Sequence, residues 1–195
     1  MKAETGHENQ GLAPAPQDDD LPALARRAVE TFVRERLLID PGPRQPDSIL
    51  NFKAACFVSI KTPHDLRGCI GTIEPFKDTL AEEIVTNAVH AATRDPRFQP
   101  VSTEELPDLR YSVDVLEPPE PARFEDLDPV QYGVIVEDES GTRRGLLLPN
   151  IEGIETVEQQ VRIAARKAGI PPDTPLRLHR FRVRRFRESP ADFKV

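Results

Sequence analysis

The sequence has few of the features that mark secreted, membrane or nucleic-acid-binding proteins. Its 195 residues include only two cysteines, Cys56 and Cys69, which are too few for a disulfide framework. No apolar run is long enough to span a bilayer, and no signal-peptide pattern opens the chain. The net charge of −7 argues against general binding of nucleic acid, which needs clustered positive charge. We therefore expect a cytoplasmic protein with reduced thiols that does not enter the membrane.

Common nucleotide and metal motifs are also missing. The phosphate-binding patterns G-x-x-x-x-G-K-[ST] and G-x-G-x-x-G do not occur, so nucleotide binding by those routes has no support. No second cysteine stands near Cys69 in a C-x-x-C arrangement, and H-E-x-x-H is absent. We therefore expect no structural zinc site, and the sequence names no cofactor.

The length of the chain predicts one domain, or one domain with a small additional lobe. Residues 1–20 are polar and aperiodic, so we expect them to form a disordered tail. Residues 21–188 are expected to form the single domain, and residues 189–195 a short C-terminal tail.

Helical and strand patterns alternate along the domain. Apolar spacing predicts long helices over residues 21–39 and 77–94. Capping-box patterns at Thr79–Glu82, Ser102–Glu105 and Thr156–Gln159 predict the start of the second helix, of a short helix and of a further helix. Strands are predicted over residues 54–60, 109–116, 132–136, 143–148 and 176–186. The apolar phase of the last strand shifts between Leu178 and Phe181, which indicates a bulge or a change of packing partner. The arginines of this strand favour a solvated sheet edge, with an anion or nucleic-acid patch as the alternative.

The segment Leu66–Thr72 is the strongest candidate for function. Gly68 and Gly71 flank Cys69, and Arg67 precedes them, so we interpret the segment as a functional loop. Arg67 and the helix that follows could lower the pKa of the thiol, and backbone N–H groups of the loop could bind an anion. The competing interpretation is a tight turn with a packed cysteine. Cys56, within a predicted strand, is interpreted as a small core residue.

Several other polar residues could complete a site. His64 and His90 are candidate bases for Cys69, although their spacing is not diagnostic and favours a surface or capping histidine in each case. Glu74, and Asp95 with Arg97, stand at opposite ends of the helix predicted over residues 77–94. They could share a cleft only if another element folds back over the helix. The alternative interpretation is that Glu74 stabilises the helix N-terminus through the helix dipole and that Asp95 belongs to a turn.

Several segments together resemble the AMME chromosomal region family. They are LRGCIGTIE at residues 66–74, Asn87-Ala88, DPRF at residues 95–98, Tyr132-Gly133 and GLLLP at residues 145–149. The match runs in order from about Val29 to Phe186. Residues 148–153 and 166–170 look like the prokaryotic branch, whose members are called AmmeMemoRadiSam system protein A.

The resemblance implies an α+β fold, with a mixed sheet and flanking helices, in which a larger and a smaller lobe enclose a cleft. It implies that the L-R-G-C-I-G-T segment lies at this cleft, and it implies genetic association with a Memo-like protein and a radical S-adenosylmethionine enzyme. The candidate catalytic residues are Cys69, His64, Glu74 and His90. The candidate binding residues are Arg67, Gly68, Gly71, Thr72, Asn87, Asp95 and Arg97.

Two functions follow from these observations. The first is an enzyme, or part of one, that uses Cys69 as a nucleophile or acid-base group on a small anionic or modified substrate. The second is a non-catalytic binding or adaptor module that presents a substrate or partner to the same system. The sequence does not identify the substrate or the reaction.

Overall fold

The computed structural model describes residues 20–42 and 48–188. The tails expected over residues 1–20 and 189–195 lie outside these ranges, apart from Asp20, which caps the first helix. The predicted α+β class is confirmed: three α-helices accompany eight strands in the described residues. The strands form two separate antiparallel sheets, not the mixed sheet expected from the family resemblance.

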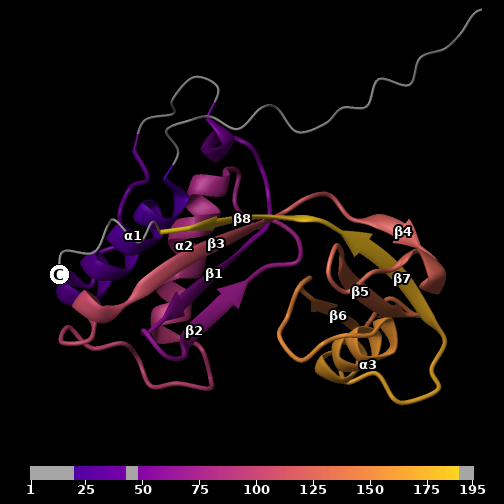
Figure 1. Ribbon diagram of the computed structural model, residues 1–195. Coiled ribbons are helices and arrows are strands. Elements are labelled where there is room, and N and C mark those ends of the chain that lie inside the picture. Colours follow the sequence, from indigo (N-terminus) through magenta and orange to yellow (C-terminus); the bar gives the residue numbers. More distant parts are fainter. Residues whose placement is uncertain (1–19, 43–47, 189–195) are drawn as a thin grey trace, which may run out of the picture.

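Sheet A carries the first two helices on one of its faces (Figure 1). Its strand order is β2-β1-β3-β8, with bounds Leu66–Gly71, Cys56–Lys61, Arg110–Leu116 and Val183–Arg187. The helices are α1, Leu21–Glu35, and α2, Leu80–Thr93. Alternate β1 side chains, namely Cys56, Val58 and Ile60, are buried beneath them in the main core.

Sheet B has its own helix and a smaller core. Its strand order is β4-β7-β5-β6, with bounds Glu120–Ala122, Leu176–Phe181, Gly133–Asp138 and Arg144–Leu147. Helix α3, Val157–Lys167, packs against β5 and β6 and buries Val161 and Ala164. Three short 3-10 helices, Ile49–Asn51, Leu106–Asp108 and Phe124–Asp126, lie in the connections.

The starts of α2 and α3 are fixed by the capping boxes that the sequence predicts. The Thr79 hydroxyl accepts the N–H of Glu82, and Thr156 accepts that of Gln159. In each pair the longer side chain accepts the N–H of the threonine in return. The helix expected after Ser102 is wrong, because that segment forms turns and then the 3-10 helix at Leu106–Asp108.

The last strand passes from one sheet to the other. Strands β7 and β8 follow one another with only Arg182 between them, and Figure 1 shows them as a nearly continuous path across the molecule. The predicted change of packing partner is therefore confirmed, slightly beyond the position that the phase shift indicates. Strand β8 lies at the edge of sheet A, as expected for the arginine-rich segment.

A third apolar cluster joins the two sheets. It contains Ala55 and Leu116 from the sheet A side and Ile135, Leu146 and Phe181 from sheet B. Phe57, on the face of β1 opposite the helices, packs against the same cluster. The second face of sheet A is thus partly covered by the sheet B half. The two lobes with a cleft between them, and the single domain over residues 21–188, stay predictions.

Candidate functional site

The glycine-cysteine segment is a strand, β2, and not the loop that the sequence predicts. A Cβ on Gly68 would lie 2.3 Å from the carbonyl oxygen of Ala91 in α2. A Cβ on Gly71 would lie 2.3 Å from Cγ of Phe57. Neither glycine has a positive φ, so both serve close packing rather than a turn. The expected anion site made of loop N–H groups is therefore wrong.

Arg67 forms an ion pair with Glu105. It lies at a bulge, because Ile60 pairs with Gly68 while Lys61 pairs with Leu66. Its guanidinium donates to both carboxylate oxygens of Glu105, with distances of 2.6 and 3.0 Å. Arg67 is not among the charges that act on the Cys69 thiol. The expectation that Arg67 lowers the pKa of this thiol is not met.

The Cys69 side chain lies on the face of sheet A opposite α1 and α2. Cys69 pairs with Ser59 of β1, whose hydroxyl donates to the thiol with an Oγ–Sγ distance of 3.3 Å. Ser59 alternates with the core residues Val58 and Ile60, so it and Cys69 share the other face. Both side chains are half-buried. The thiol is therefore outside the helix-side core.

Asp95 and Arg97 bind the exposed edge of β2 at Cys69. An Asp95 carboxylate oxygen accepts the Cys69 N–H at 2.8 Å, and the Arg97 guanidinium donates to the Cys69 carbonyl at 3.4 Å. The two side chains also form a two-point ion pair, with distances of 2.9 and 2.7 Å. The Arg97 hydrogen bonds hold the pKa of Asp95 at about 2. This pair takes the place of a further strand and fixes the backbone under the thiol.

The charges around the Cys69 thiol come from both halves of the molecule. Arg97, Asp95 and Asp114 act on it from the sheet A half. Lys167, the last residue of α3, adds a positive charge from the sheet B half. Its ammonium donates to the carbonyl of Leu146 at 3.2 Å, and no ion pair among the described residues includes it.

The other charges near the thiol are already balanced. Arg185 of β8 donates to both carboxylate oxygens of Asp114, with distances of 2.6 and 2.8 Å, and Asp114 is buried. Asp95 is likewise neutralised by Arg97. Within residues 20–42 and 48–188, two closed ion pairs and one cation without a carboxylate partner therefore act on the thiol. An anion next to Cys69 would gain favourable interactions with Lys167 and with the half-exposed Arg97.

Burial decides the protonation state of the isolated site. It raises the pKa of the Cys69 thiol, and the Ser59 hydrogen bond and the Arg97 charge oppose this only in part. Burial also lowers the pKa of Lys167, since it disfavours the ammonium form. The thiol is thus protonated at neutral pH, and its activation requires a proton acceptor.

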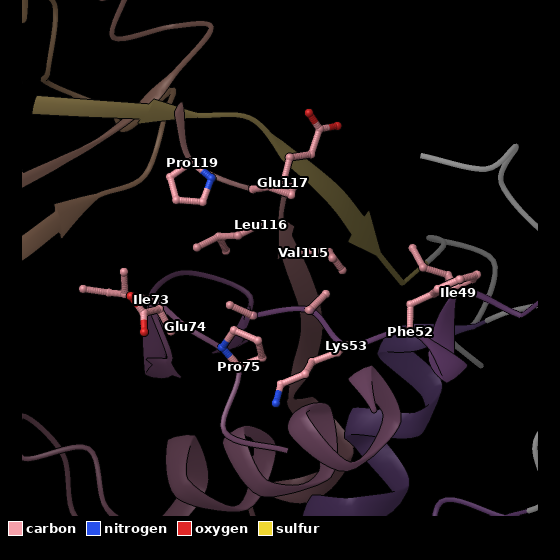
Figure 2. A pocket seen from close by; sticks show the side chains of 13 residues that line it. Ile49, Phe52, Lys53, Ile73, Glu74, Pro75, Val115, Leu116, Glu117 and Pro119 are labelled. Atoms are coloured by element: carbon pink, nitrogen blue, oxygen red, sulfur yellow. The ribbon is translucent and has the colours of Figure 1, made fainter. Parts of the chain in front are cut away.

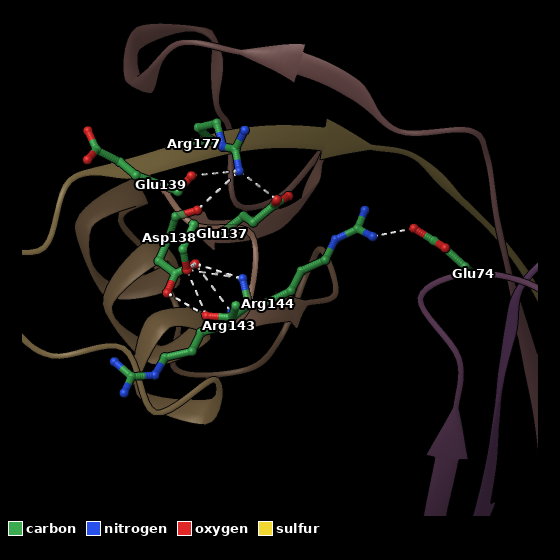
Figure 3. A network of polar contacts seen from close by, with 9 residues as sticks. Glu74, Glu137, Asp138, Glu139, Arg143, Arg144 and Arg177 are labelled. Carbon is green, nitrogen blue, oxygen red and sulfur yellow. Dashed lines mark hydrogen bonds and ion pairs between the residues drawn. The ribbon is translucent and has the colours of Figure 1, made fainter.

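The other candidate catalytic residues lie away from the thiol. His64 is exposed in the turn between β1 and β2. His90 lies on α2, on the opposite side of the sheet, where burial lowers its pKa. Figure 3 shows Glu74 reaching from the end of β2 to an ion pair with Arg144 of β6. The structure brings none of these three side chains into contact with Cys69.

Thr72 and Asn87 hold the strands against α2. The Thr72 hydroxyl donates to the buried carboxylate of Glu83 at 2.5 Å. The Asn87 amide donates to the carbonyl of Cys56 at 3.0 Å. Cys56 is sealed in the core as expected, and burial raises its pKa to about 12. These contacts are structural, and they lie on the helix side of sheet A.

Sequence reasoning missed Ser59, Asp114, Lys167 and Arg185. The first is a single polar residue within an apolar strand, which is a signal for an outward-facing position. Lys167 carried no local signal, and Arg185 was marked only as one arginine of a basic strand, because only the tertiary fold brings these residues to Cys69. Among the described residues, no three His, Cys, Asp or Glu side chains gather as a metal site would require. No described helix has the length and apolar character needed to cross a bilayer.

An apolar cavity of about 420 Å³ opens beside the cluster that joins the two sheets (Figure 2). Ile73 and Pro75 line it from the segment after β2, and Leu116 and Pro119 from the segment that leads toward sheet B. Phe52, which is 56% exposed, stands at its wall. Cys69 does not line this cavity, so it is separate from the thiol site.

Comparison with known proteins places these features in a family. The family model described as AMMECR1 matches residues 22–190. A protein from Thermotoga maritima is 51% identical over 84% of this chain and 94% of its own length. One from Clostridium acetobutylicum is 44% identical over 89% of this chain, which is only 37% of that longer protein. The crystal structure of PH0010 from Pyrococcus horikoshii superimposes with a TM-score of 0.79 at 32% identity, covering 89% of this chain and 92% of that one.

Proposed function

Since the chain belongs to the AMMECR1 family, which itself names no reaction, we propose its function from the site: an enzyme or enzyme component that uses Cys69 on a small anionic substrate. The observation that carries this proposal is the meeting of Cys69 with Lys167. The half-buried thiol of one half of the molecule interacts electrostatically with Lys167 of the other half, which has no carboxylate partner among the described residues. Arg97, which is half-exposed beside the same thiol, strengthens the attraction for an anion.

The residues divide the work as follows. Cys69 is the reacting group, and Ser59 orients its sulfur by the hydrogen bond that it donates. Lys167, as an ammonium, attracts the anionic substrate and stabilises the thiolate that forms when water takes the proton of Cys69. His64, His90 and Glu74 are not assigned a role in this step, because those three side chains lie elsewhere. Asp95 positions Cys69 through the backbone.

We further propose that the protein is cytoplasmic and acts with a Memo-like protein and a radical S-adenosylmethionine enzyme. The length of the Clostridium acetobutylicum relative supports a partner of some kind. In that protein most of the chain lies outside the segment that matches this one. A fused segment in one relative is the arrangement expected of modules that work together.

The alternative is a non-catalytic adaptor that presents a substrate or partner to that system. The apolar cavity beside Phe52 favours this function, as does Phe76, which is 83% exposed. Large exposed aromatic side chains are typical of interaction surfaces. This alternative is tested by a pull-down with neighbouring gene products. Loss of the partners in a double variant, Phe52→Ser with Phe76→Ser, together with their retention in Cys69→Ala, would support the adaptor.

The catalytic proposal is tested with cell metabolites and two matched cysteine variants. Purified wild type, Cys69→Ala and Cys56→Ala are each incubated with a metabolite extract, which is then examined by mass spectrometry. We expect the wild type and Cys56→Ala to consume at least one anionic metabolite that Cys69→Ala leaves untouched. Equal consumption by all three proteins would refute a reacting role for Cys69. The assay is repeated with the partner proteins added, which tests whether the protein is active only as a component of a larger enzyme.

A further inference from the structure

A row of polar side chains crosses the face of sheet A that carries Cys69. The strand registers pair Cys69 with Ser59, Ser59 with Ser112, and Ser112 with Arg187. Residues paired in this way point to the same face of a sheet. The row therefore runs from the thiol on β2, through two hydroxyls on β1 and β3, to a guanidinium on β8.

A polar cavity of about 430 Å³ lies at the arginine end of this row. Three alternate residues of β8 form one wall: Val183, Arg185 and Arg187. The other walls come from the loops before β5 and after β6, and consist of Val130, Gln131, Pro149 and Asn150. Both halves of the molecule thus contribute to the cavity, as both contribute charges to Cys69.

Arg187 differs from the other arginines of β7 and β8 in having no partner among the described residues. Arg177, Arg180 and Arg185 pair with carboxylates, while Arg182 and Arg184 contact the side chains of Tyr132 and Phe186. Arg187 is exposed at the cavity wall, and its neighbour Arg185 is held there by Asp114. A solvated edge explains the five partnered arginines, but it gives Arg187 no role. Its charge instead makes the cavity attractive to an anion.

We propose that this cavity binds the anionic end of an elongated substrate whose reacting end lies at Cys69. The inference rests on the proposed function and adds a substrate class to it. Neighbouring strands are about 4.8 Å apart, so β2 and β8 place the two ends about 14 Å from each other. The substrate is therefore a small molecule with a phosphate or carboxylate group at about that distance from the reacting atom.

The cavity is tested first without any reaction. Inorganic phosphate and acetate are each titrated into ¹⁵N-labelled protein, and the amide resonances of Gln131, Asn150 and Arg187 are followed. We expect saturable shifts for one or both anions, and binding about tenfold weaker in Arg187→Gln. Arg27→Gln, which removes an exposed arginine of α1, should bind as the wild type does. Shifts that do not saturate, or an Arg187→Gln variant with unchanged affinity, would overturn the proposal.

The connection to Cys69 is tested with two alkylating reagents. Iodoacetamide carries no charge, whereas a naphthyl iodoacetamide with a sulfonate carries an anion at the end of the molecule remote from its reactive carbon. We expect Arg187→Gln to slow labelling by the sulfonated reagent about tenfold and to leave the iodoacetamide rate unchanged. Equal effects on both reagents would contradict the link. The two proposals can fail separately. If Cys69→Ala has no effect on metabolite consumption but the wild type still binds phosphate, the proposed function is refuted and the anion site is retained.

Discussion

Ser59 donates a hydrogen bond to the thiol of Cys69 across the β1–β2 pair, with Oγ and Sγ 3.3 Å apart. The N–H and carbonyl of Cys69 point away from β1, toward Asp95 and Arg97. Ser59 and Cys69 therefore form a non-hydrogen-bonded pair, in which opposite side chains approach most closely. The contact is a consequence of register, and a shift of β2 by one residue would move the thiol to the helix side.

Replacement of Ser59 by alanine should raise the pKa of the Cys69 thiol further. The Ser59 hydroxyl stabilises the thiolate through its donated hydrogen bond and so lowers the pKa of the thiol. Without this hydroxyl, less remains to offset the rise in pKa that burial causes. The pH dependence of alkylation by iodoacetamide should shift to higher pH. Ser112→Ala, which changes the next hydroxyl in the row, serves as the control. A profile that is the same in Ser59→Ala and the wild type would contradict the assignment.

The Asp95–Arg97 pair should stabilise the fold in a pH-dependent way. The pKa of Asp95 is about 2 in the fold and near its ordinary value of 3.8 when unfolded. The stabilisation is therefore complete above about pH 4 and is lost as the pH falls through 2, and it amounts to about 2 kcal/mol. Asp95→Asn should lose about this amount in urea unfolding at pH 7 and show less acid sensitivity. The exposed Asp108→Asn should change neither quantity; an equal loss there would refute the prediction.

A side chain at position 68 should be poorly tolerated. The Cβ of Gly68→Ala would lie 2.3 Å from the Ala91 carbonyl oxygen, so β2 or α2 would have to move. We expect a loss of about 1 to 3 kcal/mol in the free energy of unfolding. Lys61→Ala, at an exposed position of β1, should cost much less. A Gly68→Ala protein as stable as the wild type would show that the strand and helix are less closely packed.

The buried ion pair Asp114–Arg185 should contribute more to the free energy of unfolding than the exposed pair Glu74–Arg144. Asp114→Asn leaves Arg185 without its carboxylate in a buried setting and should cost about 3 kcal/mol. Glu74→Gln breaks an exposed pair with Arg144 and should cost less than about 1 kcal/mol, an effect that salt reduces further. Urea unfolding at low and high salt measures both. Similar losses in the two variants would contradict this distinction.

The sequence predicts local structure better than it predicts the site. Capping residues such as Thr79 and Thr156 act within one turn, so their helices are readable from neighbouring residues. The need for glycine at position 68 cannot be recognised in this way. It arises because the backbone of Ala91, which belongs to helix α2, packs directly against Gly68. Residues 66–71 therefore resemble a loop, although they form a strand.

The neighbours of Cys69 show the same limit. Arg67 stands two residues away and binds Glu105, whereas Lys167 is distant in sequence and acts on the thiol. The sequence identifies the cysteine correctly as the more accessible of the two. It does not indicate that burial raises the pKa of its thiol, since that depends on how the two sheets pack.

The most direct test of the account compares iodoacetate with iodoacetamide on the native protein. The two reagents share a reactive carbon and differ in charge, and the buried Cys56 should react with neither. We predict that Cys69 is labelled, with an iodoacetate-to-iodoacetamide rate ratio above that of free cysteine, and that Lys167→Gln lowers this ratio. A Cys69 that stays unlabelled until the protein unfolds, or a ratio equal to that of free cysteine, would contradict an accessible thiol on an anion-attracting face.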